Sequence, residues 1–443
     1  MPPSPRYHHI HQDIGPWMLA LGGCGEFGAN LTLYGSAGVW IAVDCGMAMN
    51  SNEAGITEVS VPSLAALDKL DIRIEALLIT HGHEDHIGAI PALWRKLRCP
   101  IYATAHTHRL ISAKLNPNEN GPRQIMVKPM QTVSVGPFSA QWLPVTHSIP
   151  EAQAICLEVA GKRLYHSGDW KLDAQPMVGP LTAQAALQQL GRAGVDVVIG
   201  DSTNATVAGS SRSEQEVAQS LAKAMKTASG RLVVVCFASN VARMHSIVAA
   251  ADRVDRYSGV LGRSIATHVG ASRASGYLDT DTKLLPNWEL GFLPREQQCW
   301  IATGSQAEPG SALVRLSMGN HPAFGLQAGD TVLFSSRVIP GHEQALEQLC
   351  QRLRELGVHI IDDDALHASG HPPVEDLTTL YGWLKPRYLL PVHGETRHQE
   401  AHMQVGRTLG MDGIVPRNGD LISLTGKPFI AGSTVVGKIL QQR

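Results

Sequence analysis

The chain has 443 residues, of which 44% are hydrophobic and 17% are charged, and its formal net charge is −2. This length predicts two or three substructures rather than one small core, and the composition excludes extensive disorder. The small net charge excludes any argument for nucleic-acid binding from overall electrostatics, because backbone binding relies on concentrated Lys and Arg.

The predicted elements follow a mixed α/β order. Short apolar runs between turn residues predict strands at 17–23, 38–46, 74–83, 100–104, 154–161, 162–169 and 195–202. Helices are predicted at 90–97 and 181–194. From 211 the pattern changes to a long helix at 211–230 and then to strands at 231–239, 298–305 and 330–336, which indicates an inserted α/β domain. The predicted domains are therefore 1–207, 208–345 and 346–443, the last segment closing the first domain.

Cysteine usage and the N-terminal segment bear on the cellular compartment. The seven cysteines are scattered singly and contain no C-x-x-C pair, so neither a disulfide framework nor a thiolate zinc site is expected. The start MPPSPRYHHIHQ carries no leader pattern, and no apolar run approaches the roughly 18 residues of a membrane span. The sequence predicts a cytoplasmic protein with reduced, mostly buried thiols and no membrane partner.

A cluster of metal-ligand residues follows the apolar run 74–79. It has the form H-x-H-x-D-H, in which His81 and His83 can chelate one metal while Asp85 and His86 turn toward a second. Two metals need further ligands, and three candidates also follow apolar runs: His147, Asp169 and His393. Strand ends at one edge of a sheet can converge on a point, so these side chains are expected to meet.

Several longer motifs carry a family resemblance along nearly the whole chain. They are GGCGEFGANLTL, ITHGHEDHIGAIPAL, THSIPEA, HSGDWKLDAQP, GDSTNA, TGSQAEPGSAL, HASGHP and PVHGETRH. Together they resemble the metallo-β-lactamase-fold nucleases of the β-CASP group, specifically the ribonuclease J family. The resemblance implies an α/β fold, an αββα metallo-β-lactamase sandwich with an inserted β-CASP domain.

The resemblance also implies two zinc ions per chain, with manganese as an alternative. His81, His83 and His147 would hold one ion, and Asp85, His86 and His393 the other. Asp169 would bridge the two ions, and Asp44 would orient a ligand from the outer shell.

The implied catalytic residues are Asp85, His371 and Asp201. His371, oriented by Asp201, would either donate a proton to the leaving alkoxide oxygen or only bind a phosphate oxygen, and both roles stay open. The implied phosphate-binding residues are Ser239, Asn240, Ser369, Gly370 and His371.

The activity that the resemblance implies is hydrolysis of phosphodiester bonds in single-stranded RNA, from the 5′ end, internally, or both. His393 favours RNA, because the DNA-directed branch of the group carries an aliphatic residue there. The alternatives are another hydrolase of this fold that acts on thioesters or lactams, a DNA nuclease, and a non-catalytic RNA-binding subunit. The first alternative, a hydrolase of thioesters or lactams, does not explain the presence of Asp201 or of the HASGH motif. Many family members continue into a further small domain whereas this sequence ends at Arg443, which leaves a homodimer open.

Other histidines and glycines are interpreted as structural. His8, His9, His11, His106 and His108 are expected at the surface or in loops. GGCGEFG lacks the spacing and the lysine of a P-loop and is expected to turn tightly beside the metal site. His367 is expected to support its loop, and Ala307 stands where the family commonly has glycine.

Overall fold

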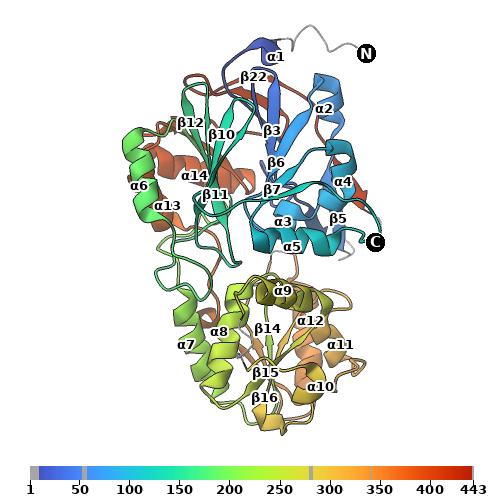
Figure 1. Cartoon of the computed structure of the whole chain (residues 1–443). Coiled ribbons are helices and arrows are strands. Elements are labelled where there is room, and N and C mark those ends of the chain that lie inside the picture. The colour runs from blue at the N-terminus through green and yellow to red at the C-terminus, as the bar shows by residue number, and fades with distance from the viewer. Residues whose placement is uncertain (1–8, 52–56, 279–282, 340, 442–443) are drawn as a thin grey trace.

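The computed structural model describes residues 9–51, 57–278, 283–339 and 341–441. Figure 1 shows two lobes: an upper one with two packed sheets between helices, and a lower one with a single sheet flanked by helices. The chain enters the lower lobe after strand β13 (Val197–Asp201) and is back in the upper lobe at helix α13 (Val374–Leu384), which precedes β19 (Tyr388–Val392). This arrangement confirms the predicted sandwich with an inserted domain.

The first sheet of the upper lobe has eight strands in the order β22-β21-β1-β2-β3-β6-β7-β8. Its strands are β1 (Trp17–Gly22), β2 (Leu31–Ser36), β3 (Val39–Val43), β6 (Ile74–Leu78), β7 (Ile101–Ala103), β8 (Gln124–Met126), β21 (Asp420–Ser423) and β22 (Phe429–Ser433). β21 pairs antiparallel with β1. The end of the chain therefore completes the sheet that the first strand begins.

The second sheet has seven strands in the order β20-β19-β13-β12-β11-β10-β9. Besides β13 and β19, they are β9 (Thr132–Val135), β10 (Phe138–Pro144), β11 (Gln153–Val159), β12 (Lys162–His166) and β20 (Asp412–Gly413). β12, β13 and β19 run parallel. Their carboxyl ends therefore lie side by side, and predicted site residues lie there: Asp169 shortly after β12, Asp201 at the end of β13 and His393 directly after β19.

The two sheets enclose one buried layer and are covered by helices on their outer faces. Met18, Tyr34 and Leu78 of the first sheet share a hydrophobic cluster with Trp142 and Leu390 of the second. The helices of this lobe are α1 (His9–Gln12), α2 (Ala65–Leu70), α3 (Glu84–Ile87), α4 (Ile90–Leu97), α5 (Ala105–Lys114), α6 (Gln184–Ala193), α13 (Val374–Leu384) and α14 (Thr396–Thr408). Among the helices of the described residues, none combines the length and the apolar character that a membrane crossing requires.

The lower lobe is a parallel sheet in the order β15-β16-β14-β17-β18. Its strands are β14 (Leu232–Val235), β15 (Tyr257–Leu261), β16 (Gln298–Ala302), β17 (Thr331–Phe334) and β18 (His359–Asp362). Its helices are α7 (Glu214–Met225), α8 (Val241–Asp252), α9 (Arg263–Ala274), α10 (Asn287–Leu290), α11 (Ala312–Ser317) and α12 (Glu343–Glu355). The domain boundaries at 207/208 and 345/346 stay predictions.

The helix predicted at 211–230 is shorter in the structure. The Ser213 hydroxyl accepts from the Glu216 amide, and the Glu216 carboxylate accepts from the Ser213 amide. This capping box fixes the start of α7 after Ser213. A separate three-stranded sheet, β23-β5-β4, joins β4 (Ala48–Ser51), β5 (Thr57–Pro62) and β23 (Lys438–Gln441).

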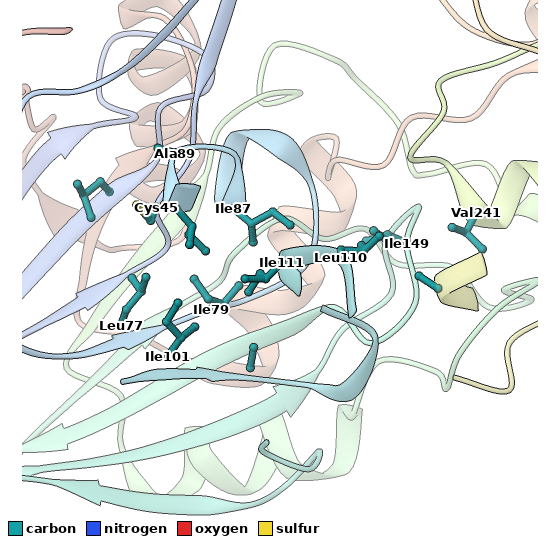
Figure 2. Close-up of a cluster of buried hydrophobic side chains, with 14 of the residues drawn as sticks. Cys45, Leu77, Ile79, Ile87, Ala89, Ile101, Leu110, Ile111, Ile149 and Val241 are labelled. Carbon is teal, nitrogen blue, oxygen red and sulfur yellow. The ribbon is translucent and has the colours of Figure 1, made fainter. Parts of the chain in front are cut away.

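The hydrophobic core continues from the upper lobe toward the lower one. Figure 2 shows buried side chains that extend from Cys45 and Leu77 past Ile79 and Ile87 to Ile149 and Val241. Ile79 lies just before the H-x-H-x-D-H loop and Ile87 just after Asp85 and His86, and both are buried. Apolar packing on either side of the loop therefore fixes its position.

Candidate metal centre and active site

The H-x-H-x-D-H residues occupy the connection between β6 and α3. β6 ends at Leu78, His81 and His83 lie in the loop, and Asp85 and His86 lie in α3. A Cβ on Gly46 would stand 1.5 Å from the Asp85 carbonyl oxygen, so only glycine allows this close approach. The strand predicted at 74–83 ends early, which leaves the histidines free to turn inward.

The predicted ligands gather in two groups that share Asp169. In the first, the ligand atoms of His81, His83, His147 and Asp169 all lie within 4.8 Å of one another. The second group contains Asp85, His86, Asp169 and His393, within the same limit. The structure thus brings together all seven residues that the sequence proposed as metal ligands.

Asp44 holds one ring of the second group. His86 Nδ1 donates to Asp44 Oδ2 (2.7 Å), which leaves Nε2 to face Asp169 Oδ2 at 3.2 Å. Asp44 also accepts from the backbone amide and hydroxyl of Thr80. Its backbone has φ +62°, an uncommon conformation for a residue other than glycine. The Asp44 carboxylate thereby fixes the tautomer of His86, and its outer-shell role stays a prediction.

Two further rings are oriented from outside the groups. His147 Nδ1 donates to the Gly370 carbonyl oxygen (2.7 Å). His393 Nδ1 donates to the Thr203 hydroxyl (2.9 Å), and its Nε2 lies 3.1 Å from Asp85 Oδ2. Each ring therefore presents Nε2 to the interior of its group.

The two groups differ in their electrostatics. Burial lowers the pKa of His81 and His147 well below its usual range and that of His83 to about 4, so these rings are neutral at pH 7, the form that binds metals. Burial opposes charge on His86 and His393, but the surrounding carboxylates raise their pKa values well above the usual range.

Within the described ranges, the carboxylates in and beside the second group are paired with histidines only. Asp44, Asp85, Asp169 and Asp201 form no ion pair with Lys or Arg among the described residues, only with histidines. His81 Nε2 and Asp169 Oδ1 are buried without a hydrogen-bond partner in the described part of the chain. An unpartnered imidazole nitrogen, an unpartnered carboxylate oxygen and a cluster of carboxylates without Lys or Arg partners all fit divalent cations.

His371 and Asp201 form a pair beside the two groups. His371 Nδ1 donates to Asp201 Oδ2 (2.8 Å) and lies 3.8 Å from Asp169 Oδ2. The Asp201 side chain is fully buried, whereas His371 leaves 22% of its side chain exposed. Burial opposes the charge, but Asp201 and Asp169 raise the pKa of His371 above its usual value. The ring can therefore carry a proton to an opening of the site.

The predicted phosphate-binding residues lie on two segments near the metal groups. Ser369 and Gly370 precede His371, and the Ser369 hydroxyl accepts from the His371 amide. Ser239 and Asn240 lie at the start of α8, where Asn240 Oδ1 caps the helix by accepting from the Arg243 amide. The Ala242 amide donates to the Ser148 carbonyl (3.1 Å), and Ser148 Oγ lies 3.4 Å from His83 Nε2. The start of α8 is thereby tied to the first metal group.

Two histidines predicted at the surface are buried, so that prediction is wrong. His106 and His108 lie in α5 with 0% and 7% exposure. The error arose because ATAHTHR was interpreted as a loop, whereas α5 begins after Thr104 and packs against α9 of the inserted domain. His11 is half-buried and its Nε2 donates to the Leu70 carbonyl; the side chains of His8 and His9 lie outside the described residues.

Sequence reasoning missed a buried charge network between the lobes. Arg243 forms two bonds to the Glu214 carboxylate and also donates to the carbonyls of Leu366 and Ala368, just before Ser369. Lys171, two residues after Asp169, lies 3.0 Å from Asp173 and 3.8 Å from Glu214. No local signal marks these residues, because their partners are distant in the sequence.

Family models match this chain in three adjoining segments. Residues 39–230 match a "Beta-lactamase superfamily domain" and residues 229–353 match "Ribonuclease J, beta-CASP domain". Residues 363–416 match a "Zn-dependent metallo-hydrolase RNA specificity domain". The second match covers the strands β14 to β17 of the lower lobe, and the third contains His371 and His393.

Curated relatives match over most of the chain. Ribonuclease J of Sinorhizobium meliloti is 39% identical over 432 residues, covering 95% of this chain and 76% of the relative. Ribonuclease J of Mycolicibacterium smegmatis is 36% identical over 430 residues, covering 95% and 77%. The chain belongs to the ribonuclease J family. Membership confirms the resemblance predicted from the motifs.

A solved structure shares the fold of this chain. It is a protein of unknown function from Enterococcus faecalis, with a TM-score of 0.63 at 15% identity, covering 92% of this chain and 100% of its own. At that identity the likeness shows the fold alone. In this ribonuclease J family member the GGCGEFG turn lies beside the site, because His393 donates its amide to the Gly23 carbonyl.

Proposed function

We propose that this chain, a ribonuclease of the metallo-β-lactamase fold, hydrolyses single-stranded RNA at a centre that holds two metal ions. His81, His83 and His147 would hold one ion, and Asp85, His86 and His393 the other, with Asp169 shared. The observation that carries the proposal is that Asp169 lies both in the group with His81, His83 and His147 and in the group with Asp85, His86 and His393. Such donor sets suit zinc, and manganese is the alternative.

The chain's own residues would divide the work around those ions. When bound, the ions supply Lewis-acid charge that activates the attacking water and offsets charge on the phosphoryl group. Asp44, Thr203 and Gly370 hold the ligand rings in place. His371, held by Asp201, would give a proton to the leaving oxygen or bind a phosphate oxygen. Ser239, Asn240, Ser369 and Gly370 would contact phosphate oxygens.

The substrate is proposed to be one strand rather than a duplex, because the metal groups lie at buried strand ends and a single strand threads to them more readily. Cleavage would begin at a 5′ monophosphate, internally, or both. A homodimer and a cytoplasmic location remain predictions.

The test is cleavage of a 5′-monophosphorylated single-stranded RNA and of the matching DNA, each with zinc and with manganese. Wild type is compared with His83→Ala and with His359→Ala, a matched change at an exposed histidine of β18. We expect RNA cleavage by wild type and His359→Ala only, with metal content per chain reduced in His83→Ala.

The outcome also separates the alternatives. Mononucleotide products would indicate exonucleolytic cleavage, and internal fragments endonucleolytic cleavage. Preference for DNA would overturn the RNA assignment. If metal-loaded wild type leaves both polymers intact, a small-substrate hydrolase or a non-catalytic RNA-binding subunit replaces the proposal.

A further inference from the structure

A buried tyrosine and a buried histidine contact the turn that follows β13. Tyr381 of α13 and His402 of α14, two helices that pack against each other (Figure 1), are 3% and 0% exposed. Their rings are stacked with centroids 5.7 Å apart, and the Tyr381 hydroxyl hydrogen-bonds to His402 Nε2. His402 Nδ1 lies 2.9 Å from the hydroxyl of Ser202, which is also fully buried. The three side chains form one hydrogen-bonded row, to which the proposed metal chemistry assigns no role.

The protonation states of the row follow from its burial. Burial raises the pKa of Tyr381 well above its usual value, so the hydroxyl keeps its proton at pH 7. Burial lowers the pKa of His402 to about 4, so that ring is neutral and has one N–H and one bare nitrogen. Among the described residues the Tyr381 hydroxyl has no other hydrogen-bond partner, so it donates to His402 Nε2. The remaining N–H, at Nδ1, then donates to the Ser202 hydroxyl.

The other residues of this turn hold His371. Asp201 Oδ2 accepts from the His371 ring, and Asn204 Nδ2 donates to the His371 carbonyl (3.1 Å). Between them, the Thr203 amide donates to Asp201 Oδ1 (2.9 Å). Ser202 is the residue of the turn whose side chain bonds to α14. A shift of Ser202 would therefore disturb both contacts of His371.

Gly200 lets the row pack directly against the end of β13. A Cβ at this position would lie 2.8 Å from the Tyr381 hydroxyl oxygen and 2.9 Å from His402 Cε1, so only glycine allows the two rings to lie this close. Packing this tight restricts how far the His402 ring can move. The row is therefore a fixed support for the turn.

The metal ligand beside the turn has ties of its own. The Thr203 hydroxyl donates to the His393 carbonyl (3.2 Å) and accepts from His393 Nδ1 (2.9 Å). Neither bond involves the Ser202 side chain. Loss of the row should therefore disturb His371 more than it disturbs metal binding.

We infer that His402, with its tautomer set by Tyr381, is a positioning residue for phosphodiester cleavage that acts through Ser202 to hold the Asp201 carboxylate against His371. The inference rests on the proposed function for the reaction that His371 serves. His402 is fully buried, so it acts on that reaction only through the turn. Both roles proposed for His371 are exerted most strongly in the transition state, so the effect belongs in kcat.

Two replacements of His402 separate its two bonds. His402→Asn keeps an N–H near the place of Nδ1 and can donate to Ser202, whereas His402→Gln keeps a polar group near the place of Nε2 and bonds only to Tyr381. Each loses one buried hydrogen bond, so a merely structural role predicts similar losses. We expect kcat for RNA to fall about tenfold in His402→Gln and in Ser202→Ala, and less than about threefold in His402→Asn. KM should stay within about twofold and zinc content should be unchanged.

The controls distinguish positioning from a general defect. Tyr165 of β12 is fully buried and its hydroxyl has no hydrogen-bond partner among the described residues, so Tyr165→Phe should leave kcat unchanged. The double variant Ser202→Ala/His402→Gln should be no slower than either single variant, because both remove the same contact. Urea unfolding of each variant detects a loss of stability, and Ser202→Ala removes only one oxygen atom should a His402 variant fail to fold. Equal kcat in His402→Asn and His402→Gln, or additive losses in the double variant, would overturn the inference.

A spectroscopic measurement tests the row without catalysis. Zinc-loaded protein labelled with ¹⁵N in its histidines is compared by NMR, and the His371 signals are identified by their absence in His371→Ala. We expect these signals to shift in His402→Gln and Ser202→Ala and to stay in place in Tyr165→Phe. Unmoved His371 signals in the first two variants would overturn the inference. If metal-loaded wild type cleaves no RNA, the proposed function fails, and the NMR series still decides whether His402 positions His371.

Discussion

At the scale of single residues, Gly370 has a role that its neighbours cannot supply. A Cβ at this position would lie 2.6 Å from His147 Cε1 and 2.9 Å from its Nδ1, closer than real side chains approach. We therefore predict that Gly370→Ala displaces the His147 ring and lowers metal content toward one ion per chain. RNA cleavage should fall at least a hundredfold, while Gly161→Ala, at a position with open space but φ +71°, should leave metal content unchanged. Full metal occupancy in Gly370→Ala would contradict this account.

Asp44 is the second residue whose effect should be indirect. Asp44→Asn keeps one oxygen for Thr80 but turns the acceptor for His86 Nδ1 into a weaker one or a donor. Loss of such an outer-shell partner typically costs about 10- to 100-fold in metal affinity. We expect that shift in zinc Kd, measured by competition with a chelating dye, and recovery of cleavage at high zinc. A loss that excess zinc does not restore would place Asp44 in the chemistry itself.

At the scale of elements, the start of α8 combines a cap with a proposed phosphate contact. Asn240→Ala removes the oxygen that accepts from the Arg243 amide and should cost about 1 kcal/mol of unfolding free energy. Asn240→Asp keeps a capping oxygen but replaces the amide donors with a negative charge. We expect Asn240→Asp to unfold in urea like wild type and to raise KM for RNA. An unchanged KM would leave Asn240 with the capping role only.

At the scale of the whole molecule, the buried network around Glu214 joins the lobes. Glu214 and Arg243 are 2% and 0% exposed, and Arg243 also holds the carbonyls that precede the His371 loop. Removing one partner of a buried pair typically costs about 3 to 5 kcal/mol. We predict that Glu214→Gln loses an amount of this order and that RNA cleavage falls with it. Glu216→Gln, beside it on α7 but mostly exposed to solvent, should lose far less.

The contribution of the Glu214–Arg243 pair to stability should depend on pH, and the direction of the Glu214 pKa shift sets how. Burial favours the neutral carboxyl, but the charges of Arg243 and Lys171 outweigh it and lower the pKa of Glu214. A folded-state pKa below the unfolded value of about 4.3 gives stability that is complete above that pH and is lost as the pH falls through the folded pKa. The difference in unfolding free energy between wild type and Glu214→Gln should be constant from pH 6 to 8 and shrink below about pH 4. A difference that grows on acidification would exclude this pair as its source.

The sequence alone identified the candidate metal ligands of this protein, because these residues lie in local motifs. The H-x-H-x-D-H cluster and the single ligands His147, Asp169 and His393 each follow an apolar strand, and such spacing can be read without coordinates. The periodicity of the apolar runs predicted a mixed α/β order with an inserted α/β domain, and the family resemblance carried by the motifs implied the sandwich.

Only the tertiary structure decided which distant residues support those ligands. The Gly370 carbonyl reaches His147 across 223 positions of the chain, and Arg243 reaches Leu366 and Ala368 across 123 and 125. His106 was misplaced for the same reason, because burial of α5 depends on α9, an element of the other lobe. Local patterns report the chemistry of a segment and its own backbone preference, whereas burial, tautomer and charge compensation are set by groups that meet only when the lobes pack together.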